Sequence, residues 1–185
     1  MKIVETILPG CVVIEPDVFG DARGFFYESY NAEKYKNAGF DLTFVQSNVS
    51  RSAHGVLRGL HYQYPNPQGK LVSVVDGEVY DVAVDIRTGS PTFGRWAAAI
   101  LSVANKRHFW IPEGFAHGFA VLSEFATFSY QCTALYDRAG DASILWNDGD
   151  IGIDWPIAAP QLSDKDLKAP FLRDIPRDKL PTYRA

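Results

Sequence analysis

The feature that most constrains the fold of this chain is the shortness of its apolar runs, which glycine, proline, asparagine and aspartate keep interrupting. These runs are rich in Val, Ile, Phe, Tyr and Trp, the residues that favour pleated sheets. The clearest pair covers residues 70–75 and 78–87, joined by Asp76-Gly77, a dipeptide typical of a tight hairpin. The pattern therefore predicts a β-rich protein in which helix is the minority.

Residues 78–87 also indicate how such a hairpin is buried. Val82, Val84 and Ile86 alternate with residues that include Asp85 and Arg87. A period of two is typical of a strand that buries one face, so we expect the other face to be wet. Further strands are expected over residues 96–101, 108–111 and 125–135, because turn-forming residues separate runs of similar composition.

Two short helices are predicted at the periphery. One covers residues 32–38, with Asn31 as its N-cap and Gly39 as its stop signal, and the other opens at Ser163, which places Asp166 in the capping-box position. The sequence contains no internal repeat or linker. We therefore expect one antiparallel double-sheet barrel over residues 1–185, with a ragged, proline-rich tail from about residue 159.

Composition excludes several classes of function. The net charge of −4 and the lack of a basic stripe argue against nucleic-acid binding and favour a small partner. No uncharged apolar stretch approaches the roughly 18 residues of a membrane span, and the first residues lack the apolar run of a signal peptide. Cys11 and Cys132 are far apart in a chain of 185 residues, so we expect free thiols and a cytoplasmic protein.

Two of the histidines, His61 and His117, lie in stretches that can be compared with the two cupin motifs. Residues 112–117 read P-E-G-F-A-H and fit the P-x-G-x-x-H signature of the second cupin motif, so the chain resembles a cupin. The first cupin motif normally supplies H-x-H and a glutamate as metal ligands, but this chain has His61-Tyr62-Gln63 and then Lys70. A lysine ammonium repels a cation, so we expect no metal. We interpret His117 as a residue that faces a ligand, the alternative being a hydrogen-bonded structural histidine.

Seven blocks of sequence carry a closer resemblance. They are F-G-D-A-R-G-F-F-Y-E-S-Y (19–30), V-L-R-G-L-H-Y-Q (56–63), Q-G-K-L-V (68–72), D-V-A-V-D-I-R (81–87), S-P-T-F-G (90–94), I-P-E-G-F-A-H-G-F (111–119) and S-I-L-W-N-D (143–148). In this order they look like the dTDP-4-dehydrorhamnose 3,5-epimerase family over nearly the full chain. The resemblance implies an all-β jelly roll of the cupin type with a few short peripheral helices.

The resemblance also implies a reaction. The expected enzyme is a cofactor-free isomerase of L-rhamnose biosynthesis that inverts C3 and C5 on either side of the C4 ketone. Its substrate would be dTDP-4-dehydro-6-deoxy-D-glucose and its product dTDP-4-dehydro-L-rhamnose. A C–H next to a ketone is a very weak acid, so the chemistry needs a base, a cation at the enolate oxygen and an acid on the opposite face of the ring.

Four residues suit these roles. His61 suits the base, because imidazole titrates near neutrality, and the resemblance supplies Asp166, with Asp164 as a substitute, as the carboxylate that orients it. Lys70 suits the cation, and Tyr130 the acid. The alternatives are that Asp166 only caps a turn, that Lys70 is a solvated strand end, and that Tyr130 is a packed core ring.

The resemblance further implies the substrate contacts. Arg58 is expected to meet a phosphate or the keto oxygen, although strict alternation places it on the other face from His61, so a bulge is needed. Tyr136 looks like the aromatic that stacks on thymine. The family often has aspartate in place of Ser47 and glutamate in place of Asp141. The remaining expected contacts are Arg23, Glu28, Gln46, Ser47, Asn48, His117, Asp141 and Lys165.

Other functions remain possible for this scaffold, and a homodimer is expected. A single-carbon epimerase or a 3,4-ketoisomerase would share the scaffold, but Tyr130 with Asp166 argues against a ketoisomerase. The missing H-x-H disfavours a metal-dependent oxygenase, and a non-catalytic binding module would tolerate the loss of His61 or Tyr130, which are both present. The resemblance implies a homodimer, in which a strand-rich N-terminal segment adds to a neighbouring sheet edge and brings Arg23 and Glu28 to the partner's pocket.

Overall fold

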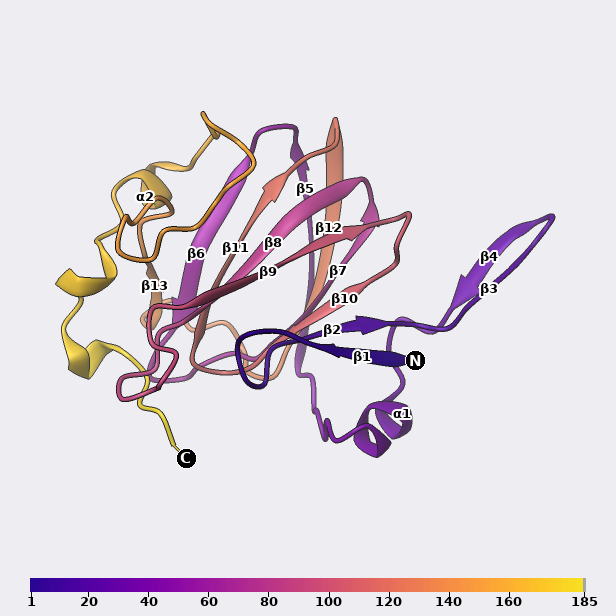
Figure 1. Ribbon diagram of the computed structural model, residues 1–185, viewed down its shortest axis with the longest axis horizontal. Coiled ribbons are helices and arrows are strands. Elements are labelled where there is room, and N and C mark those ends of the chain that lie inside the picture. Colours follow the sequence, from indigo (N-terminus) through magenta and orange to yellow (C-terminus); the bar gives the residue numbers. More distant parts are fainter. Residues whose placement is uncertain (185) are drawn as a thin grey trace.

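The computed structural model describes residues 1–184, and in it two antiparallel sheets pack face to face (Figure 1). One sheet has six strands in the order β1 (Lys2–Glu5), β2 (Val12–Glu15), β10 (His108–Ile111), β7 (Lys70–Asp76), β12 (Phe125–Cys132) and β5 (Gln46–Ala53). The other has five, in the order β13 (Asp141–Ser143), β6 (Leu57–Gln63), β11 (Phe115–Val121), β8 (Glu78–Asp85) and β9 (Trp96–Ser102). The predicted antiparallel double-sheet fold is confirmed.

The prediction of a hairpin at Asp76-Gly77 is wrong, although both of its strands and its turn exist. Strand β7 pairs with β10 and β12, whereas β8 pairs with β9 and β11, so the turn carries the chain from one sheet to the other. Gly77 adopts a φ of +82°, and a Cβ there would lie 2.0 Å from the carbonyl oxygen of Phe125. The glycine allows a tight turn to pack on β12, and the sheets diverge from it.

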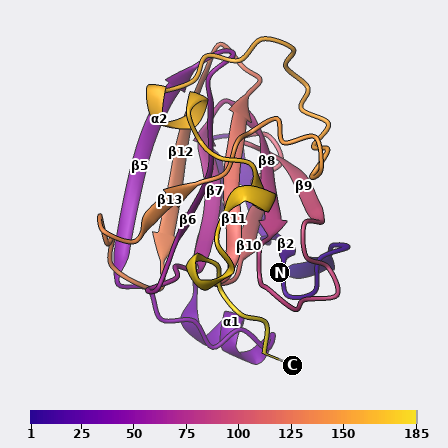
Figure 2. The same cartoon turned by 90° about the vertical axis from the view of Figure 1, so that its left-hand side faces the viewer.

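The expected wet face of β8 is also wrong. Val82, Val84 and Ile86 are fully buried, and so are Ala83 and Asp85 on the opposite face. The outward row packs with apolar residues of the last third of the chain, including Ile151, Leu172 and Leu180. The last third of the chain crosses the outer face of the five-stranded sheet (Figure 2). The alternation along β8 therefore separates residues buried between the two sheets from residues buried under this C-terminal part of the chain.

Both predicted helices are confirmed. In α1 (Ala32–Asn37) the side chain of Asn31 accepts a hydrogen bond from the amide of Lys34, and Tyr35 packs in a cluster on the six-stranded sheet. In α2 (Asp164–Leu167) the hydroxyl of Ser163 caps the amide of Asp166. Two 3₁₀ turns follow, at Leu172–Asp174 and Arg177–Lys179. None of the helices within residues 1–184 has the length and apolar character that a membrane crossing requires.

A separate hairpin leaves the barrel near the N-terminus. Strands β3 (Val18–Asp21) and β4 (Gly24–Tyr27) pair only with each other and project away from both sheets (Figure 1). Three phenylalanines on this hairpin, Phe19, Phe25 and Phe26, are exposed. Apolar rings that stand in water on an extended arm are a feature of surfaces that meet a partner.

Candidate active site

A histidine and a carboxylate meet at one end of the barrel. His61 on β6 has its Nε2 atom 2.7 Å from Oδ1 of Asp166, which α2 brings over the sheet. Ser163 donates its hydroxyl proton to the other oxygen of Asp166 at 2.8 Å. Asp164 is exposed and makes no such contact, so Asp166 is the carboxylate beside His61.

The protonation of this pair follows from its contacts. Burial raises the pKa of Asp166, but the hydrogen bonds and charge of His61 and Ser163 hold it below its ordinary value. An ionised carboxylate only accepts hydrogen bonds, so Nε2 of His61 carries the proton and Nδ1 is the basic nitrogen. The His61 side chain is 34% exposed. The arrangement is suited to a general base.

A second histidine and carboxylate lie next to the first. His117 on β11 stands directly opposite His61 in the strand register, and it is only 7% exposed. Its Nε2 atom lies 3.0 Å from each oxygen of Asp81, a fully buried residue of β8. Burial lowers the pKa of His117, with the charge of Asp81 opposing that change. His117 is thus both hydrogen-bonded and close to the candidate base.

Lys70 is the first residue of β7 and faces this group from the other sheet. In the register it stands opposite Cys132 of β12 and Ile111 of β10. Within residues 1–184 its ammonium has neither a hydrogen bond nor an ion pair. Burial lowers the pKa of Lys70, while the charges of Cys132, Asp141 and Asp81 act in the opposite direction. A cation without a fixed partner is available to a developing oxyanion.

Tyr130 also belongs to the sheet that faces His61. Along β12 it shares the inner face with Phe128 and Cys132, and its ring packs against the main core cluster. Burial raises the pKa of its phenol, and the charge of Arg58 partly offsets this rise. The phenol is therefore neutral and protonated at neutral pH. A ring bound between the sheets would have His61 on one side and Tyr130 on the other.

The bulge that Arg58 needs is present. Across β6 and β11 His117 pairs with His61, but Phe119 pairs with Arg58, so β6 contains one extra residue between these pairs. The shift turns Arg58 to the face that carries His61. Gly59 makes the bulge possible. Its φ is +118°, and any Cβ there would lie 2.5 Å from Cα of Gly118 on the neighbouring strand. Arg58 donates from Nε to Ser52 at 3.0 Å and is otherwise exposed.

The mouth of the barrel holds a polar network. Gln46 bonds through its amide nitrogen to Asn48 at 3.0 Å and accepts the backbone N–H of Tyr136 at 2.8 Å. Asp141 receives the Tyr136 hydroxyl at 3.1 Å and the Lys165 ammonium at 2.5 Å. These five residues come from β5, β13, α2 and the segment between β12 and β13. Ser47 alternates to the exposed outer face of β5, away from them.

Arg23 and Glu28 lie apart from all other predicted site residues in this chain. Arg23 is at the tip of the β3–β4 hairpin, where its 90% exposed side chain pairs with Asp21 at 2.5 Å. Glu28 follows the hairpin and binds Lys34 and Asn31 of the α1 region. The β3–β4 hairpin, which carries Arg23 between its strands, projects away from β6, the strand of His61 (Figure 1).

The residues that sequence reasoning missed are Asp81 and Gly59. Asp81 lies on the inner row of β8 between Val79 and Ala83, and two aspartates, Asp81 and Asp85, in a row that also holds these apolar residues are the signal that could have revealed it. Gly59 stands between Arg58 and His61, where a bulge was needed. Among residues 1–184 no group of three or more His, Cys, Asp or Glu side chains is placed to hold a metal ion.

Comparison with known proteins gives a consistent result. A family model described as dTDP-4-dehydrorhamnose 3,5-epimerase matches residues 5–174. The dTDP-4-dehydrorhamnose 3,5-epimerase of Salmonella typhimurium is 55% identical over 175 residues, which are 93% of this chain and 96% of that protein. The enzyme of the same name from Pseudomonas aeruginosa is 53% identical, over 94% of this chain and 97% of its own.

Solved structures agree with the sequence matches. The crystal structure of a dTDP-6-deoxy-D-glucose-3,5-epimerase from Legionella pneumophila, in complex with dTDP-4-keto-L-rhamnose, is 54% identical and has a TM-score of 0.97. The alignment covers 100% of this chain and 99% of that one. A 3'-monoepimerase from Streptomyces bikiniensis, in complex with dTDP-quinovose, is 37% identical with a TM-score of 0.91, and covers 97% and 93% of the two chains.

Proposed function

Since the chain belongs to the dTDP-4-dehydrorhamnose 3,5-epimerase family and is an isomerase of dTDP-linked sugars, we propose that His61, Lys70 and Tyr130 carry its reaction. His61 removes the protons at C3 and C5 of the 4-keto sugar. Lys70 stabilises the enolate oxygen at C4. Tyr130 returns a proton to the opposite face of the ring, so each carbon is inverted.

The observation that carries this mechanism is the position of the two proton-transfer groups. His61, oriented by Asp166 at 2.7 Å, belongs to the five-stranded sheet, and Tyr130 belongs to the six-stranded sheet that faces it. A base that removes a proton and alone returns it gives exchange without inversion. Two groups on opposing walls supply what inversion requires.

We propose that the nucleotide lies at the mouth of the barrel. Arg58, Lys165 and Gln46 offer donors for a diphosphate and a base edge, and Tyr136 is exposed enough to stack on thymine. Asn48 and Asp141 extend this polar rim, and His117 completes it from inside. A structure that is 54% identical contains a dTDP-sugar, which supports the same ligand class here.

Neither a metal nor an organic cofactor is part of the proposed mechanism. Lys70 and Gln63 occupy the positions where a metal-binding cupin has ligands, and the Lys70 ammonium supplies the positive charge that a metal would bring. The two thiols, Cys11 and Cys132, are free and buried, which supports a reducing compartment such as the cytoplasm.

The β3–β4 hairpin supports the proposal of a homodimer. Its phenylalanines Phe19, Phe25 and Phe26 are exposed, although the Lys106 ammonium lies 4.2 Å from the centre of the Phe25 ring, and β5, an edge of the six-stranded sheet, bears the exposed Val49. An arm that reaches a second copy would cover such an edge and bring Arg23 and Glu28 to the mouth of the neighbouring barrel. In this arrangement Arg23 and Glu28 of one chain and the other predicted site residues of its neighbour, except Ser47, would belong to the same site.

The test of the mechanism separates exchange from inversion in heavy water. For Tyr130→Phe, which removes only a hydroxyl, we expect deuterium to enter the substrate while formation of the L-sugar falls by roughly 10²–10⁴-fold. For His61→Ala we expect both to be lost, with the fold intact. NMR of the sugar reports deuterium at C3 and C5 separately. Inversion at a near wild-type rate in Tyr130→Phe would show that the acid is another group.

A further inference from the structure

The helix that carries Asp166 is too short to hold its own position. α2 has four residues, and an isolated helix of that length is not stable in water. The distance of 2.7 Å between Oδ1 of Asp166 and Nε2 of His61 therefore depends on the contacts that fix the chain on either side of α2.

Before α2, the chain is fixed to the segment that leads into β6. The amide of Gln161 donates to the carbonyl of Gly55 at 2.8 Å, and the carbonyl of Gln161 accepts from the amide of Leu57 at 3.0 Å. Leu57 opens β6, the strand that carries His61. Both bonds join backbone groups, so they do not depend on the identity of the side chains.

After α2, the chain is fixed by a buried side chain, that of Asp148. Its Oδ2 atom accepts the backbone N–H of Leu172 at 2.7 Å, six residues beyond Asp166. Its Oδ1 atom accepts the backbone N–H of Asp150 at 3.0 Å, and its own carbonyl accepts that of Gly152 at 2.9 Å. Asp148 is 2% exposed, so its carboxylate is held firmly within its own turn.

The contacts of Asp148 require a carboxylate. Both of its oxygens accept N–H groups, whereas an amide side chain has only one oxygen to offer. Burial of a carboxylate is unfavourable unless hydrogen bonds replace its water, and here two backbone N–H groups do so. The amide of Leu145 also donates to the carbonyl of Pro170 at 2.8 Å. The loop after β13 and residues 168–172, the segment after α2, are therefore joined at two points.

We propose that Asp148 is a positioning residue, which binds the backbone N–H of Leu172 and so holds the segment that keeps Asp166 beside His61. The inference rests on the proposed role of His61 as the base. It also gives a function to the sequence block 143–148, which ends at Asp148 and which the proposed reaction does not use.

The test removes one acceptor and keeps the shape. In Asp148→Asn one of the two N–H groups faces an amide NH₂, so the segment after α2 should shift and Asp166 should lose its alignment with His61. We expect kcat to fall by about 10²-fold, a cost typical of a misplacement of about 1 Å, with KM nearly unchanged. NMR of ¹⁵N-labelled histidine should show the His61 proton on Nε2 in the wild type and a mixture of tautomers in the variant.

A double-mutant cycle separates positioning from general destabilisation. If Asp148 acts through Asp166, Asp148→Asn should have little further effect on kcat in an Asp166→Asn background. A loss of stability alone would lower kcat to the same degree in both backgrounds. Equal losses in the two backgrounds would therefore overturn the proposal.

Asp150→Asn is the control for the link between the same two segments. The exposed carboxylate of Asp150 pairs with Arg173 at 3.0 Å, so the variant breaks a surface contact between the loop after β13 and the chain beyond α2. An exposed ion pair contributes little to position. We expect kcat and the His61 tautomer to stay as in the wild type.

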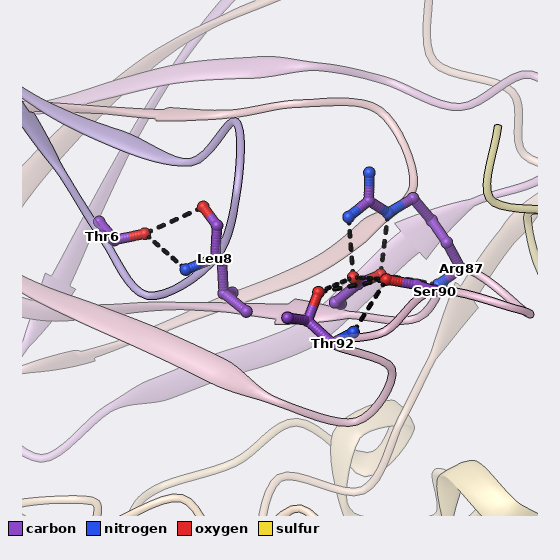
Figure 3. A network of polar contacts seen from close by, with 6 residues as sticks. Thr6, Leu8, Arg87, Ser90 and Thr92 are labelled. Atoms are coloured by element: carbon purple, nitrogen blue, oxygen red, sulfur yellow. Dashed lines mark hydrogen bonds and ion pairs between the residues drawn. The ribbon is translucent and has the colours of Figure 1, made fainter. Parts of the chain in front are cut away.

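Asp85→Asn is the control for loss of a buried carboxylate. Asp85 is 0% exposed, and the groups that donate hydrogen bonds to it belong to Arg87, Ser90 and Thr92, which Figure 3 shows in this network. We expect this variant to lower the melting temperature and to leave the His61 tautomer unchanged.

If Asp148→Asn does not fold, hydrogen exchange in the wild type decides. The amide of Leu167, which donates to the carbonyl of Ser163 within α2, should open together with the amide of Leu172 and with the same dependence on denaturant. Opening of Leu167 independently of Leu172 would contradict the proposal. An unchanged tautomer in folded Asp148→Asn overturns this inference alone, whereas wild-type kcat in Asp166→Asn would refute the proposed function of the pair.

Discussion

At the scale of single residues, Asp166 has no oxygen to spare for a substrate. One oxygen holds His61 and the other accepts the hydroxyl of Ser163, and the residue is 2% exposed. In the proposed mechanism it acts through His61, by fixing the proton on Nε2 and by stabilising the imidazolium that forms when Nδ1 takes a proton from the sugar.

Asp166→Asn should lower kcat by about 10²–10⁴-fold, because an amide can donate to Nε2 and favour the wrong tautomer. KM should change much less. The matched control is Asp164→Asn, which alters an exposed carboxylate two residues away and should leave both constants close to wild type. Steady-state kinetics with the 4-keto sugar measure the effect. Equal losses in the two variants would assign the effect to α2 as a whole.

The same carboxylate makes stability depend on pH. The pKa of Asp166 is held below its ordinary value in the folded state, so its contribution is complete above the pKa of the unfolded chain. That contribution is lost as the pH falls through the folded pKa. We expect the difference in free energy of unfolding between wild type and Asp166→Asn to shrink in acid. Denaturant unfolding from neutral to acid pH measures it, and a difference independent of pH would contradict the assignment.

Sequence reasoning could name residue types where a reaction demands them, and the catalytic roles of these residues remain predictions. His61, Lys70 and Tyr130 all face the space between the sheets, as their proposed roles require. Asp81 escaped notice because a carboxylate at an alternating position is normally interpreted as solvated. The contact with His117, which stands opposite Ala83 on the neighbouring strand β11, is what identifies Asp81 as a buried acid.

At the scale of elements, α2 is a very short helix that positions one carboxylate. Ser163→Ala removes its N-cap, a change that typically costs about 0.5–2 kcal/mol, and also removes the hydroxyl bound to Asp166. We expect kcat to fall while substrate binding is retained. Asn31→Ala, which removes the side-chain cap of α1, should destabilise the protein to a similar degree without changing kcat. Thermal unfolding and kinetics on both variants test the contrast.

The error at Asp76-Gly77 shows what a local pattern leaves out. The pattern identified both strands and the turn, but a period of two describes which side chains share a face and not which strand is the neighbour. The partners of β7 and β8 lie more than 30 residues away in several pairs, for example Tyr130 with Val72. The bulge at Gly59 also depends on strand pairing. The resemblance required a bulge between Arg58 and His61, but only the register of β6 against β11 shows where the extra residue lies.

At the scale of the whole molecule, the projecting hairpin predicts that two inactive variants rescue each other. Arg23→Ala disables the arm and His61→Ala disables the barrel. If an arm serves the neighbouring barrel, a mixed dimer has one intact site, so an equimolar mixture of exchanged subunits should regain about a quarter of the wild-type sites. Activity after mixing measures this. The absence of rescue, or a sedimentation mass near that of a single 20.6 kDa chain, would contradict the dimer.

The contact between His61 and Asp166 joins positions 105 residues apart, and the later one arrives on the segment that covers the outer face of β8. A ribosome therefore adds His61, Lys70 and Tyr130 well before it adds Asp166. In the proposed mechanism, a chain that ends before residue 166 has the imidazole but not the carboxylate that orients it. The residue that orients the proposed base therefore belongs to the same segment that covers the outer face of β8.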